Sequence, residues 1–463
     1  MSLLFETYKV DYLGFLEETA RSYEEADMRL TLKNIGKIED ADVKIDGITI
    51  IAGENNTGKS TVGKALFSVF NGFYKIDDQI KKERASNIGN LAGLLFQDVW
   101  FDEEESGKVD SRIFFQGLQS LQDFILLETM KHYSHRQTLK DNIRKRISDF
   151  SRQYGAVVIS ELNLDRYVNK VEKSFEIPDD DIAEVLLQRR LEDEFDGQIN
   201  SVFSDSNGRI ELEIRKRRVQ ITIQENKIIG IEDHFDLRTE AVYIDDPFML
   251  DNLKNHAFMM LAADSCDHRA HLISKLRPAG KSSKEKDAVS ELLTNRKLEN
   301  IFRKLNEVCR GNIVFEKPDQ YLYRESGTDK TLNIMNLSTG LKTFVIIKTL
   351  LQNGTLEENG TMILDEPEIH LHPEWQLIFA ELIVLIQKEF GMHILINTHS
   401  PYFLNAVEVY SAKHSIADKC RYYMSVSQGK TAVIEDVTDH TEAIYQKLAY
   451  PLQRLENERY GDV

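Results

Sequence analysis

The sequence from residue 47 to residue 67, GITIIAGENNTGKSTVGKALF, decides the fold of the surrounding chain. Its centre, Gly53–Ser60, fits the pattern of a glycine, four free positions and then Gly-Lys-Ser or Gly-Lys-Thr. The apolar, β-branched residues before it predict a buried strand, and the residues after it predict a helix. A strand that turns through glycines into a helix directs several backbone N–H groups and the positive helix dipole at one point. The stretch therefore predicts a binding site for a nucleoside triphosphate.

Two residues of this loop have expected roles in the chemistry. Lys59 is placed to reach the β- and γ-phosphates, and the Ser60 hydroxyl is placed to bind Mg²⁺. The other residues expected to bind the nucleotide here are Gly53, Asn55, Asn56, Gly58 and Thr61. A plain surface turn is the alternative, but at ordinary glycine frequency a chance match has odds of roughly one or two in a hundred.

Length and charge limit the classes of partner. The chain has 463 residues, enough for roughly two to three domains or for one large core with a long insertion. Its net charge of −18 makes it a poor non-specific binder of nucleic acid. DNA is a candidate partner only through a local basic surface, at residues 131–146 or 215–218. We favour the alternative in which these stretches are a solvated helix face and a hairpin turn.

The spacing of the cysteines and the hydropathy of the sequence indicate the cellular compartment in which the protein is expected. Cys266, Cys309 and Cys420 are far apart and form no CxxC or Cys/His pair, which argues against a disulfide framework and a structural zinc site. The N-terminal sequence lacks a secretion signal, and no apolar run has the length needed to span a bilayer. We therefore expect a soluble, cytoplasmic protein without a membrane partner.

The organisation along the chain predicts an α/β fold. Residues 28–75 and 312–463 are expected to form a head in which a mixed sheet is flanked by helices. Residues 76–311 predict a large, mainly helical insertion that contains a β-hairpin near residues 209–231. Residues 1–27 predict an amphipathic helical appendage, which either docks on its own domain or mediates self-association.

Two later strands supply the remaining chemistry. Residues 361–364 predict a buried strand that ends in Asp365 and Glu366. The first acid would hold Mg²⁺ through water, and the second would polarise the attacking water. Residues 392–398 predict another strand, after which His399 is placed to contact a γ-phosphate. A histidine after a strand is more often structural, but the phosphate loop and the Asp-Glu strand favour the functional interpretation.

The sequence NLSTGLK, residues 336–342, opens a predicted helix at which Ser338 and Gly340 offer a hydroxyl and backbone amides to an anion. The order of phosphate loop, Leu-Ser-x-Gly signature, Asp-Glu strand and histidine resembles that of the ABC-type ATPases, over roughly residues 29–75 and 312–405. The resemblance implies an ABC-ATPase head, ATP as the nucleotide, and two ATP molecules sandwiched between two heads. Ser338 and Gly340 would then act on the partner subunit's ATP, and the homo-oligomer would form through this sandwich and through helical elements.

The particular residues in these motifs limit the resemblance to a subgroup of the ABC-type ATPases. DEPEIHLHP at residues 365–373 and THSP at residues 398–401 are similar to the soluble RecF/SMC-like and OLD-like ATPases. His370 and His372 are candidate metal ligands, but with no third ligand in view we favour hydrogen bonds that shape the loop. The glutamine that senses the γ-phosphate in transporter heads has three alternatives in this sequence, Gln97, Gln116 and Gln119.

The chain after His399 is expected to be too short for the Toprim nuclease domain of OLD nucleases, so we interpret Glu435, Asp436 and Asp439 as surface acids.

The chain resembles the ATPase subunits of the Septu and PARIS anti-phage defence systems. That resemblance implies a slow, dimer-dependent ATPase that acts as a nucleotide-gated scaffold for a separately encoded nuclease. The alternative is a RecF-like DNA-binding ATPase of DNA repair or replication. A transporter ATPase is disfavoured by the loop after Glu366.

Overall fold

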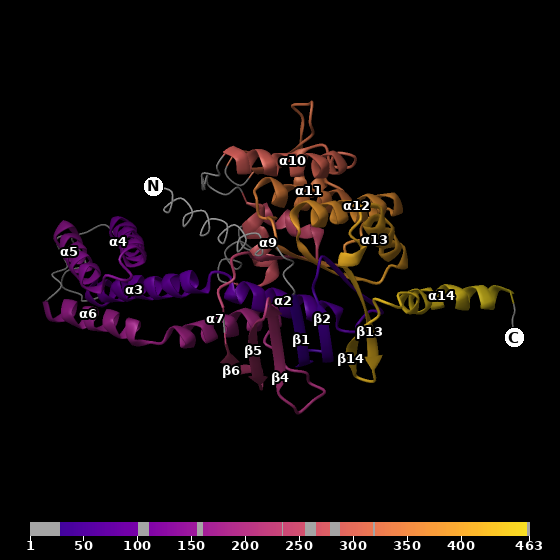
Figure 1. Cartoon of the computed structure of the whole chain (residues 1–463). Coiled ribbons are helices and arrows are strands. Elements are labelled where there is room, and N and C mark those ends of the chain that lie inside the picture. Colours follow the sequence, from indigo (N-terminus) through magenta and orange to yellow (C-terminus); the bar gives the residue numbers. More distant parts are fainter. Residues whose placement is uncertain are drawn as a thin grey trace, which may run out of the picture. The chain divides into compact units, whose positions relative to one another are not determined.

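The computed structural model describes residues 28–100, 111–154, 161–233, 235–254, 265–277, 288–317 and 320–460 (Figure 1). The expected N-terminal appendage, residues 1–27, lies outside these described residues. The chain forms two compact units. The first comprises Met1–Tyr74 with Leu187–Val463, and the second comprises Lys75–Leu186.

Most strands of the first unit form one mixed sheet. In the described part of the chain it has eleven strands, in the order β6-β5-β4-β1-β2-β14-β13-β3-β12-β11-β7. These strands are β1 Met28–Ile35, β2 Ile38–Lys44, β3 Ile48–Gly53, β4 Gly208–Ile214, β5 Arg217–Gln224, β6 Lys227–Glu232, β7 Ala241–Ile244, β11 Thr361–Asp365, β12 His393–Thr398, β13 Cys420–Gln428 and β14 Thr431–Asp436. β13, β3, β12, β11 and β7 pair in parallel, whereas β6, β5, β4, β1 and β2 pair antiparallel. A smaller antiparallel sheet contains β8 Asn312–Lys317, β9 Gln320–Arg324 and β10 Thr331–Asn333.

Strand β3 shows that the central, parallel part of the main sheet is covered on both faces, because all of its residues are buried. Ile48 and Ile50 belong to the apolar core that includes α11 Thr339–Gln352, α12 Pro373–Phe390 and α13 Pro401–Lys413. Ile51 points to the other face and belongs to the core that includes α2 Lys59–Phe73. Successive side chains of a strand point to opposite faces, so a continuous apolar run is typical of a strand between two helical layers. The expected α/β head is confirmed.

Further helical segments complete the first unit. They include η1 Pro247–Lys254, α9 His268–Leu276, α10 Ala288–Leu305, η2 Ile334–Asn336, η3 Ala417–Lys419 and α14 Glu442–Tyr460. Within the described residues, none of the helices combines the length and the apolar character that crossing a bilayer requires. Glu435, Asp436 and Asp439 are exposed at and just after the end of β14, as expected for surface acids.

The second unit is helical and has its own core. It contains α3 Ile76–Trp100, α4 Ser111–Lys131, α5 Arg136–Tyr154, α6 Glu161–Glu176 and the first half of α7 Asp179–Glu194. Ile88, Leu121 and Ile143 belong to one apolar cluster that α3, α4 and α5 share. The buried Arg84 of α3 donates to the carbonyls of Ser174 and Ile177 and so ties α3 to the end of α6.

Several basic side chains of residues 131–146 are engaged within this second unit. The ion pairs are Lys140 with Glu172 and Arg144 with Asp165, and the guanidinium groups of Arg136 and Arg146 lie over the rings of Phe175 and Phe124. Partly exposed pairs of this kind contribute little to stability, but they do neutralise charge locally. The contacts favour the interpretation of this stretch as a solvated helix face.

The insertion expected at residues 76–311 divides in the structure. Residues 75–186 form the second unit, whereas β4, β5, β6 and β7 belong to the first. The hairpin expected near residues 209–231 consists of three strands, β4, β5 and β6. These strands belong to the main sheet because β4 pairs with β1. The alternation of Ile210 and Leu212 with charged residues predicts strands, but it carries no information about which strand pairs with them.

Asn71 of α2 ties this helix to β7, the edge strand of the main sheet. Its Nδ2 donates to the Ala241 carbonyl at 2.8 Å, and the Ala241 N–H donates to its Oδ1 at 2.8 Å. Asn71→Leu leaves both backbone groups unpaired and buried, so we expect a loss of about 2–5 kcal/mol in the free energy of unfolding. Denaturant unfolding measures this loss. The exposed Asn405→Leu of α13 is the matched control, and equal stability of the two variants would contradict the account.

Candidate nucleotide-binding site

The phosphate loop is shaped by left-handed backbone between β3 and α2. Gly58 caps α2 with φ 82°, and Asn56 has φ 63°. The positive φ of Gly58 favours glycine, and a Cβ atom there would also lie 2.5 Å from Ile38 Cδ1, which would have to shift. The Thr57 hydroxyl donates to the Glu54 carbonyl at 2.8 Å, and the Ser425 hydroxyl of β13 donates to the Thr57 carbonyl at 2.6 Å. These two hydrogen bonds tie the loop to itself and to β13.

Lys59 lies inside the curve of this loop. Its Nζ donates to the Gly53 carbonyl at 3.1 Å and to the Glu54 carbonyl at 2.8 Å, and the side chain is only 5% exposed. Burial lowers the pKa of Lys59, and the nearby carboxylate of Glu366 opposes part of this shift. An ammonium group held by loop carbonyls is placed to meet an anion that enters the loop.

The loop lines a single pocket together with residues from two other segments. Its lining residues are Lys37, Asn55, Asn56, Thr57, Gly58, Lys59, Ser60, Thr61 and Glu366. The structure thus brings the sequence-predicted loop residues together with Glu366, while Gly53 ends β3 and contacts Lys59 through its carbonyl. Lys37 and Ser425 were not predicted from the sequence. Each lies on a segment remote from the loop, and no local motif marks either residue.

Asp365 and Glu366 lie at the end of β11. Asp365 is the last residue of this strand, and its Oδ2 accepts a hydrogen bond of 3.0 Å from the Tyr243 hydroxyl, while its Oδ1 is buried without a partner. Glu366 has φ 48°, a left-handed conformation that is uncommon outside glycine. Its N–H donates to the Asn397 carbonyl at 2.9 Å, which holds this turn against β12. The chain therefore turns sharply at Glu366.

His399 follows β12 and reaches the same edge of the sheet. Its Nδ1 lies 3.3 Å from Glu366 Oε1, and the same Glu366 oxygen lies 3.9 Å from Lys59 Nζ. The residues predicted from three separate motifs therefore meet at one carboxylate. The His399 side chain is 39% exposed, although its Nδ1 atom is buried next to Glu366.

The loop after Glu366 is held by His372, which was interpreted from the sequence as a shaping group, and by Glu368, which was not. His372 caps α12, and its Nδ1 accepts from the Glu374 N–H at 3.4 Å. Glu368 is buried and accepts a hydrogen bond from the Thr398 hydroxyl, and burial raises the pKa of this carboxyl group. Among the described residues, no group of three or more His, Cys, Asp or Glu side chains is arranged to hold a metal ion. A histidine metal site at His370 and His372 is thus not supported.

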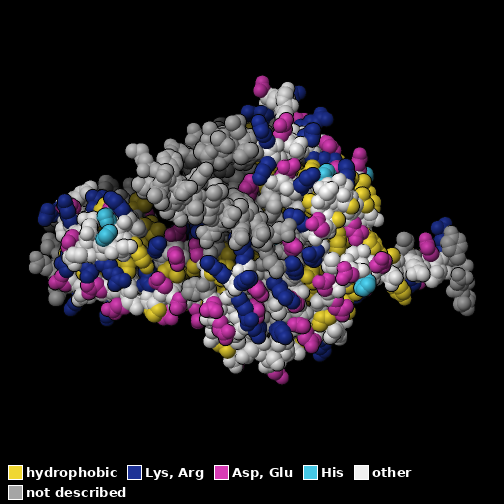
Figure 2. Space-filling model, in the orientation of Figure 1, with side chains coloured by type: hydrophobic (Ala, Val, Ile, Leu, Met, Phe, Trp, Pro, Cys, Tyr) yellow, Lys and Arg dark blue, Asp and Glu magenta, His cyan; other side chains and the backbone are white. Residues whose placement is uncertain are grey.

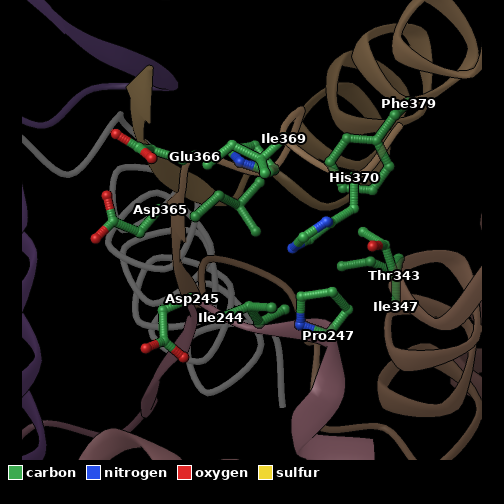
Figure 3. Close-up of a pocket in the computed structure, with 12 residues that line it drawn as sticks. Ile244, Asp245, Pro247, Thr343, Ile347, Asp365, Glu366, Ile369, His370 and Phe379 are labelled. Atoms are coloured by element: carbon green, nitrogen blue, oxygen red, sulfur yellow. The ribbon is translucent and has the colours of Figure 1, made fainter. Parts of the chain in front are cut away.

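A second pocket lies behind the Asp365–Glu366 turn (Figure 3). The ends of β7 and β11 line one side of it, and Thr343 and Ile347 of α11 line the other. His370 points into this pocket, with its ring edge-on to Phe248 at 5.9 Å between centroids. The pocket therefore places α11 next to the turn that carries the two acids.

Ser338 and Gly340 lie at the start of α11. Ser338 is exposed and caps the helix, accepting from the Leu341 N–H at 3.4 Å. Gly340 is buried, and a Cβ atom there would lie 3.0 Å from the His370 carbonyl and 3.2 Å from the Trp375 ring. The residues that line the phosphate-loop pocket do not include either of them.

The three candidates for the glutamine that senses the γ-phosphate, at positions 97, 116 and 119, all lie in the second unit.

The fold and the loop geometry define a P-loop nucleotide-binding protein. The profile of the AAA ATPase domain family matches residues 28–404. The chain therefore belongs to this family of ATPases.

Individual relatives match less of the sequence. The OLD nuclease of Thermus scotoductus is 36% identical over 84 residues, which are 18% of this chain and 15% of that protein. Among solved structures, the SMC head domain from Thermotoga maritima is 11% identical with a TM-score of 0.37, covering 89% of this chain and 98% of that one. A Pyrococcus furiosus Smc head domain bound to the C-terminal domain of ScpA is 12% identical with a TM-score of 0.32, covering 94% and 100%.

The position of Lys59 predicts the effect of its removal. Lys59→Ala removes a charged donor to phosphate, so we expect the affinity for ATP to fall by about 100-fold. Fluorescent ATP titration measures the affinity, and far-UV circular dichroism checks the fold. The matched control is Lys64→Ala on the same helix, whose Nζ donates to the Glu194 carbonyl at 2.8 Å instead of lining the pocket. Equal affinities of the two variants would contradict the assignment.

Proposed function

We propose that this chain binds and hydrolyses ATP at the site formed by the phosphate loop, the Asp365–Glu366 turn and His399. The observation that carries the proposal is the position of Glu366 Oε1, 3.9 Å from Lys59 Nζ and 3.3 Å from His399 Nδ1. A carboxylate at the mouth of a phosphate loop is the group that hydrolysis requires. Membership of the AAA ATPase domain family supports the same reaction.

Each residue of the site has a distinct task in this reaction. Lys59 supplies the counter-charge to the β- and γ-phosphates, and the loop amides add fixed dipoles. Glu366 accepts a proton from the attacking water and orients that water, because its turn directs the carboxylate over the loop. His399 lies next to Glu366 and contacts the γ-phosphate from the end of β12. Lys37 lines the same pocket and adds positive charge at its rim.

The residues of the site fit a magnesium ion. Mg²⁺ prefers oxygen ligands, and Asp365 Oδ1 is a buried carboxylate oxygen without a partner. Ser60 lines the phosphate-loop pocket at the start of α2. Ser60 and Asp365 would hold the ion, which supplies neutralisation of the phosphate charge when it is bound.

The start of α11 supports a site completed by a second copy of the chain. Ser338 is exposed at a helix N-terminus, and α11 is a helix of 14 residues whose dipole favours an anion there. The phosphate-loop pocket of the same chain is lined by other residues. In the proposed assembly, Ser338 and Gly340 of one subunit contact the γ-phosphate held by the other, so hydrolysis is slow until two heads close on ATP.

Substitution of the proposed base tests this mechanism. Glu366→Gln keeps the size of the side chain and removes its basicity, so we expect hydrolysis to fall by at least about 100-fold while ATP binding persists. Because ATP is then trapped, light scattering after gel filtration should show a stable dimer with ATP. The exposed Glu374→Gln is the matched control. Wild-type turnover in Glu366→Gln would show that the base is assigned to the wrong residue.

Adding Ser338→Arg to the Glu366→Gln protein should abolish the ATP-bound dimer without affecting the fold.

We further propose that the ATPase acts as a scaffold for a separately encoded nuclease in an anti-phage complex. The support is the resemblance of the Asp-Glu-Pro-Glu-x-His-Leu-His-Pro loop and its neighbouring motifs to the Septu and PARIS ATPase subunits. In this role, the ATP-dependent closure of two heads changes the surface that holds the nuclease. The chain then needs no nucleolytic site of its own.

A second candidate function is direct binding of DNA, and one specific observation favours it. The turn between β4 and β5 consists of Arg215 and Lys216, with φ 50° and 71°. Tight hairpin turns with two positive φ angles favour Asn and Gly, so two long basic side chains there carry a conformational cost. Two basic side chains at one turn fit an anionic partner such as a phosphate backbone. On the face shown in Figure 2, Lys and Arg side chains gather over the region of α2 and β2, with acidic side chains among them.

A pull-down separates these two functions. Tagged Glu366→Gln protein is purified from its native host, with and without nuclease treatment of the lysate, and its partners are identified by mass spectrometry. We expect a nuclease subunit in near-stoichiometric amount that survives removal of DNA. The Lys59→Ala protein is the control, since it cannot close on ATP. Recovery of replication or repair proteins only while DNA is intact would contradict the scaffold and favour DNA binding.

A further inference from the structure

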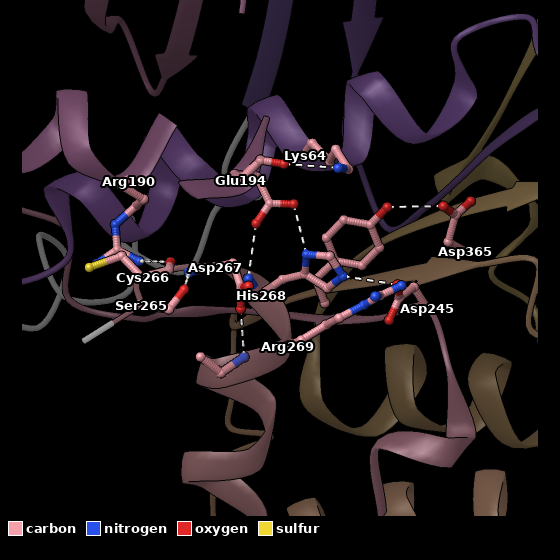
Figure 4. A network of polar contacts seen from close by, with 12 residues as sticks. Lys64, Arg190, Glu194, Asp245, Ser265, Cys266, Asp267, His268, Arg269 and Asp365 are labelled. Carbon is pink, nitrogen blue, oxygen red and sulfur yellow. Dashed lines mark hydrogen bonds and ion pairs between the residues drawn. The ribbon is translucent and has the colours of Figure 1, made fainter. Parts of the chain in front are cut away.

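A buried polar network lies behind Asp365 (Figure 4). It begins at Tyr243 of β7, the neighbour of β11 in the sheet, where Tyr243 pairs with Ile363. The Tyr243 hydroxyl donates to Asp365 Oδ2 at 3.0 Å, and the side chain is 1% exposed. Asp365 Oδ1 has no partner in the protein. One oxygen of this carboxylate is therefore engaged by the fold, and the other is left for a ligand.

The Tyr243 ring is fixed by aromatic neighbours. It stacks on the imidazole of His268, the first residue of α9, with 4.3 Å between the ring centroids and 24° between the planes. Phe67 of α2 packs against both rings, with centroids 6.3 Å from Tyr243 and 6.1 Å from His268. Since α2 also carries Lys59 at its start, the phenol is held by the same helix that carries the phosphate loop.

His268 is in turn clamped between two carboxylates. Its Nδ1 lies 2.7 Å from Glu194 Oε1, and its backbone N–H donates to Glu194 Oε2 at 2.9 Å. Its Nε2 lies 3.1 Å from Asp245 Oδ2, which also accepts from the Arg269 guanidinium at 2.6 and 2.9 Å. The imidazole therefore cannot rotate without breaking contacts at both ring nitrogens.

The charge of His268 strengthens this clamp. Burial disfavours the protonated ring, but the hydrogen bonds to Asp245 and Glu194 outweigh it and raise the pKa of His268 to about 9. The ring is then an imidazolium at neutral pH, with a carboxylate on either side. Glu194 is fully buried, so the pair is shielded from solvent.

We propose that Tyr243 and His268 are positioning residues for Asp365: the clamped imidazole fixes the phenol, and the phenol holds Oδ2 so that Oδ1 is free to bind the magnesium ion of the ATP complex. This role rests on the proposed ATPase function. It extends that function to residues that line no part of the phosphate-loop pocket and carry no recognisable motif. Outer partners that orient a metal ligand typically change metal affinity when they are removed.

Tyr243→Phe tests the proposal with a binding readout. The affinity for a fluorescent ATP analogue is measured with excess Mg²⁺ and again with EDTA. We expect the affinity with Mg²⁺ to fall by about 10-fold and the affinity in EDTA to stay the same, because only the metal-linked part depends on Asp365. Tyr445→Phe is the matched control, since the Tyr445 hydroxyl also donates to a carboxylate, that of Glu408, at 2.5 Å. It should leave both affinities unchanged.

The outcomes separate this proposal from the one on which it rests. A folded Tyr243→Phe protein that keeps the wild-type gain in affinity from Mg²⁺ would overturn the positioning role alone. A wild-type protein whose ATP affinity is the same in Mg²⁺ and EDTA would overturn both the magnesium site and the positioning role. If Tyr243→Phe does not fold, Arg269→Ala replaces it, because Arg269 is half-exposed and touches only the Asp245 end of the clamp. A smaller loss, again only with Mg²⁺, is expected there, and no loss would overturn the proposal.

Discussion

The parallel pairing of β3, β12 and β11 is the constraint on which the site depends. Ala52 pairs with Thr398, and Asn397 pairs with Asp365, so the three strands end at one edge of the sheet. The carboxyl ends of parallel strands are where α/β proteins bind ligands, because the loops and helix N-termini that follow converge there. Segments that are distant in sequence, the phosphate loop, the acidic turn and His399, meet for this reason. A slip of one residue would turn every side chain of a strand to the opposite face.

The site combines this regular frame with local features that are costly on their own. Glu366 adopts a left-handed conformation, which costs on the order of 1–3 kcal/mol for a residue with a side chain, and its N–H bond to Asn397 holds it. Lys59, Glu368 and His268 are buried polar groups, and each has at least one hydrogen-bond partner within the protein. The strained and buried groups gather around the edge where the strands end. In the proposed mechanism, this rigidity keeps the base, the lysine and the metal ligand in place before ATP binds.

The sequence predicted those parts of the site that depend on local pattern. The phosphate loop, the Asp-Glu strand and the signature helix each occupy a few consecutive residues whose spacing follows from the chemistry. Tyr243 and Lys37 could not be predicted, because they reach the site through strand pairing and a turn that no local pattern encodes. The same reason explains why the bounds of the insertion were wrong. The alternation of apolar and charged residues at 209–231 predicted strands, but the pairing of β4 with β1 had no signal in the sequence. Non-local pairing, rather than propensity, limited the prediction.

The central claim is that ATP is bound by the loop of one subunit and hydrolysed with the signature of another. Mixing Lys59→Ala and Ser338→Arg proteins tests it directly, because each is expected to be inactive alone. In their mixed dimer the substituted Ser338 faces only the Lys59→Ala loop, which holds no ATP to clash with it, and the other composite site is intact. The account predicts that ATP hydrolysis reappears on mixing and rises with the concentration of either partner. A mixture as inactive as its components would contradict the claim and place all the catalytic groups within one chain.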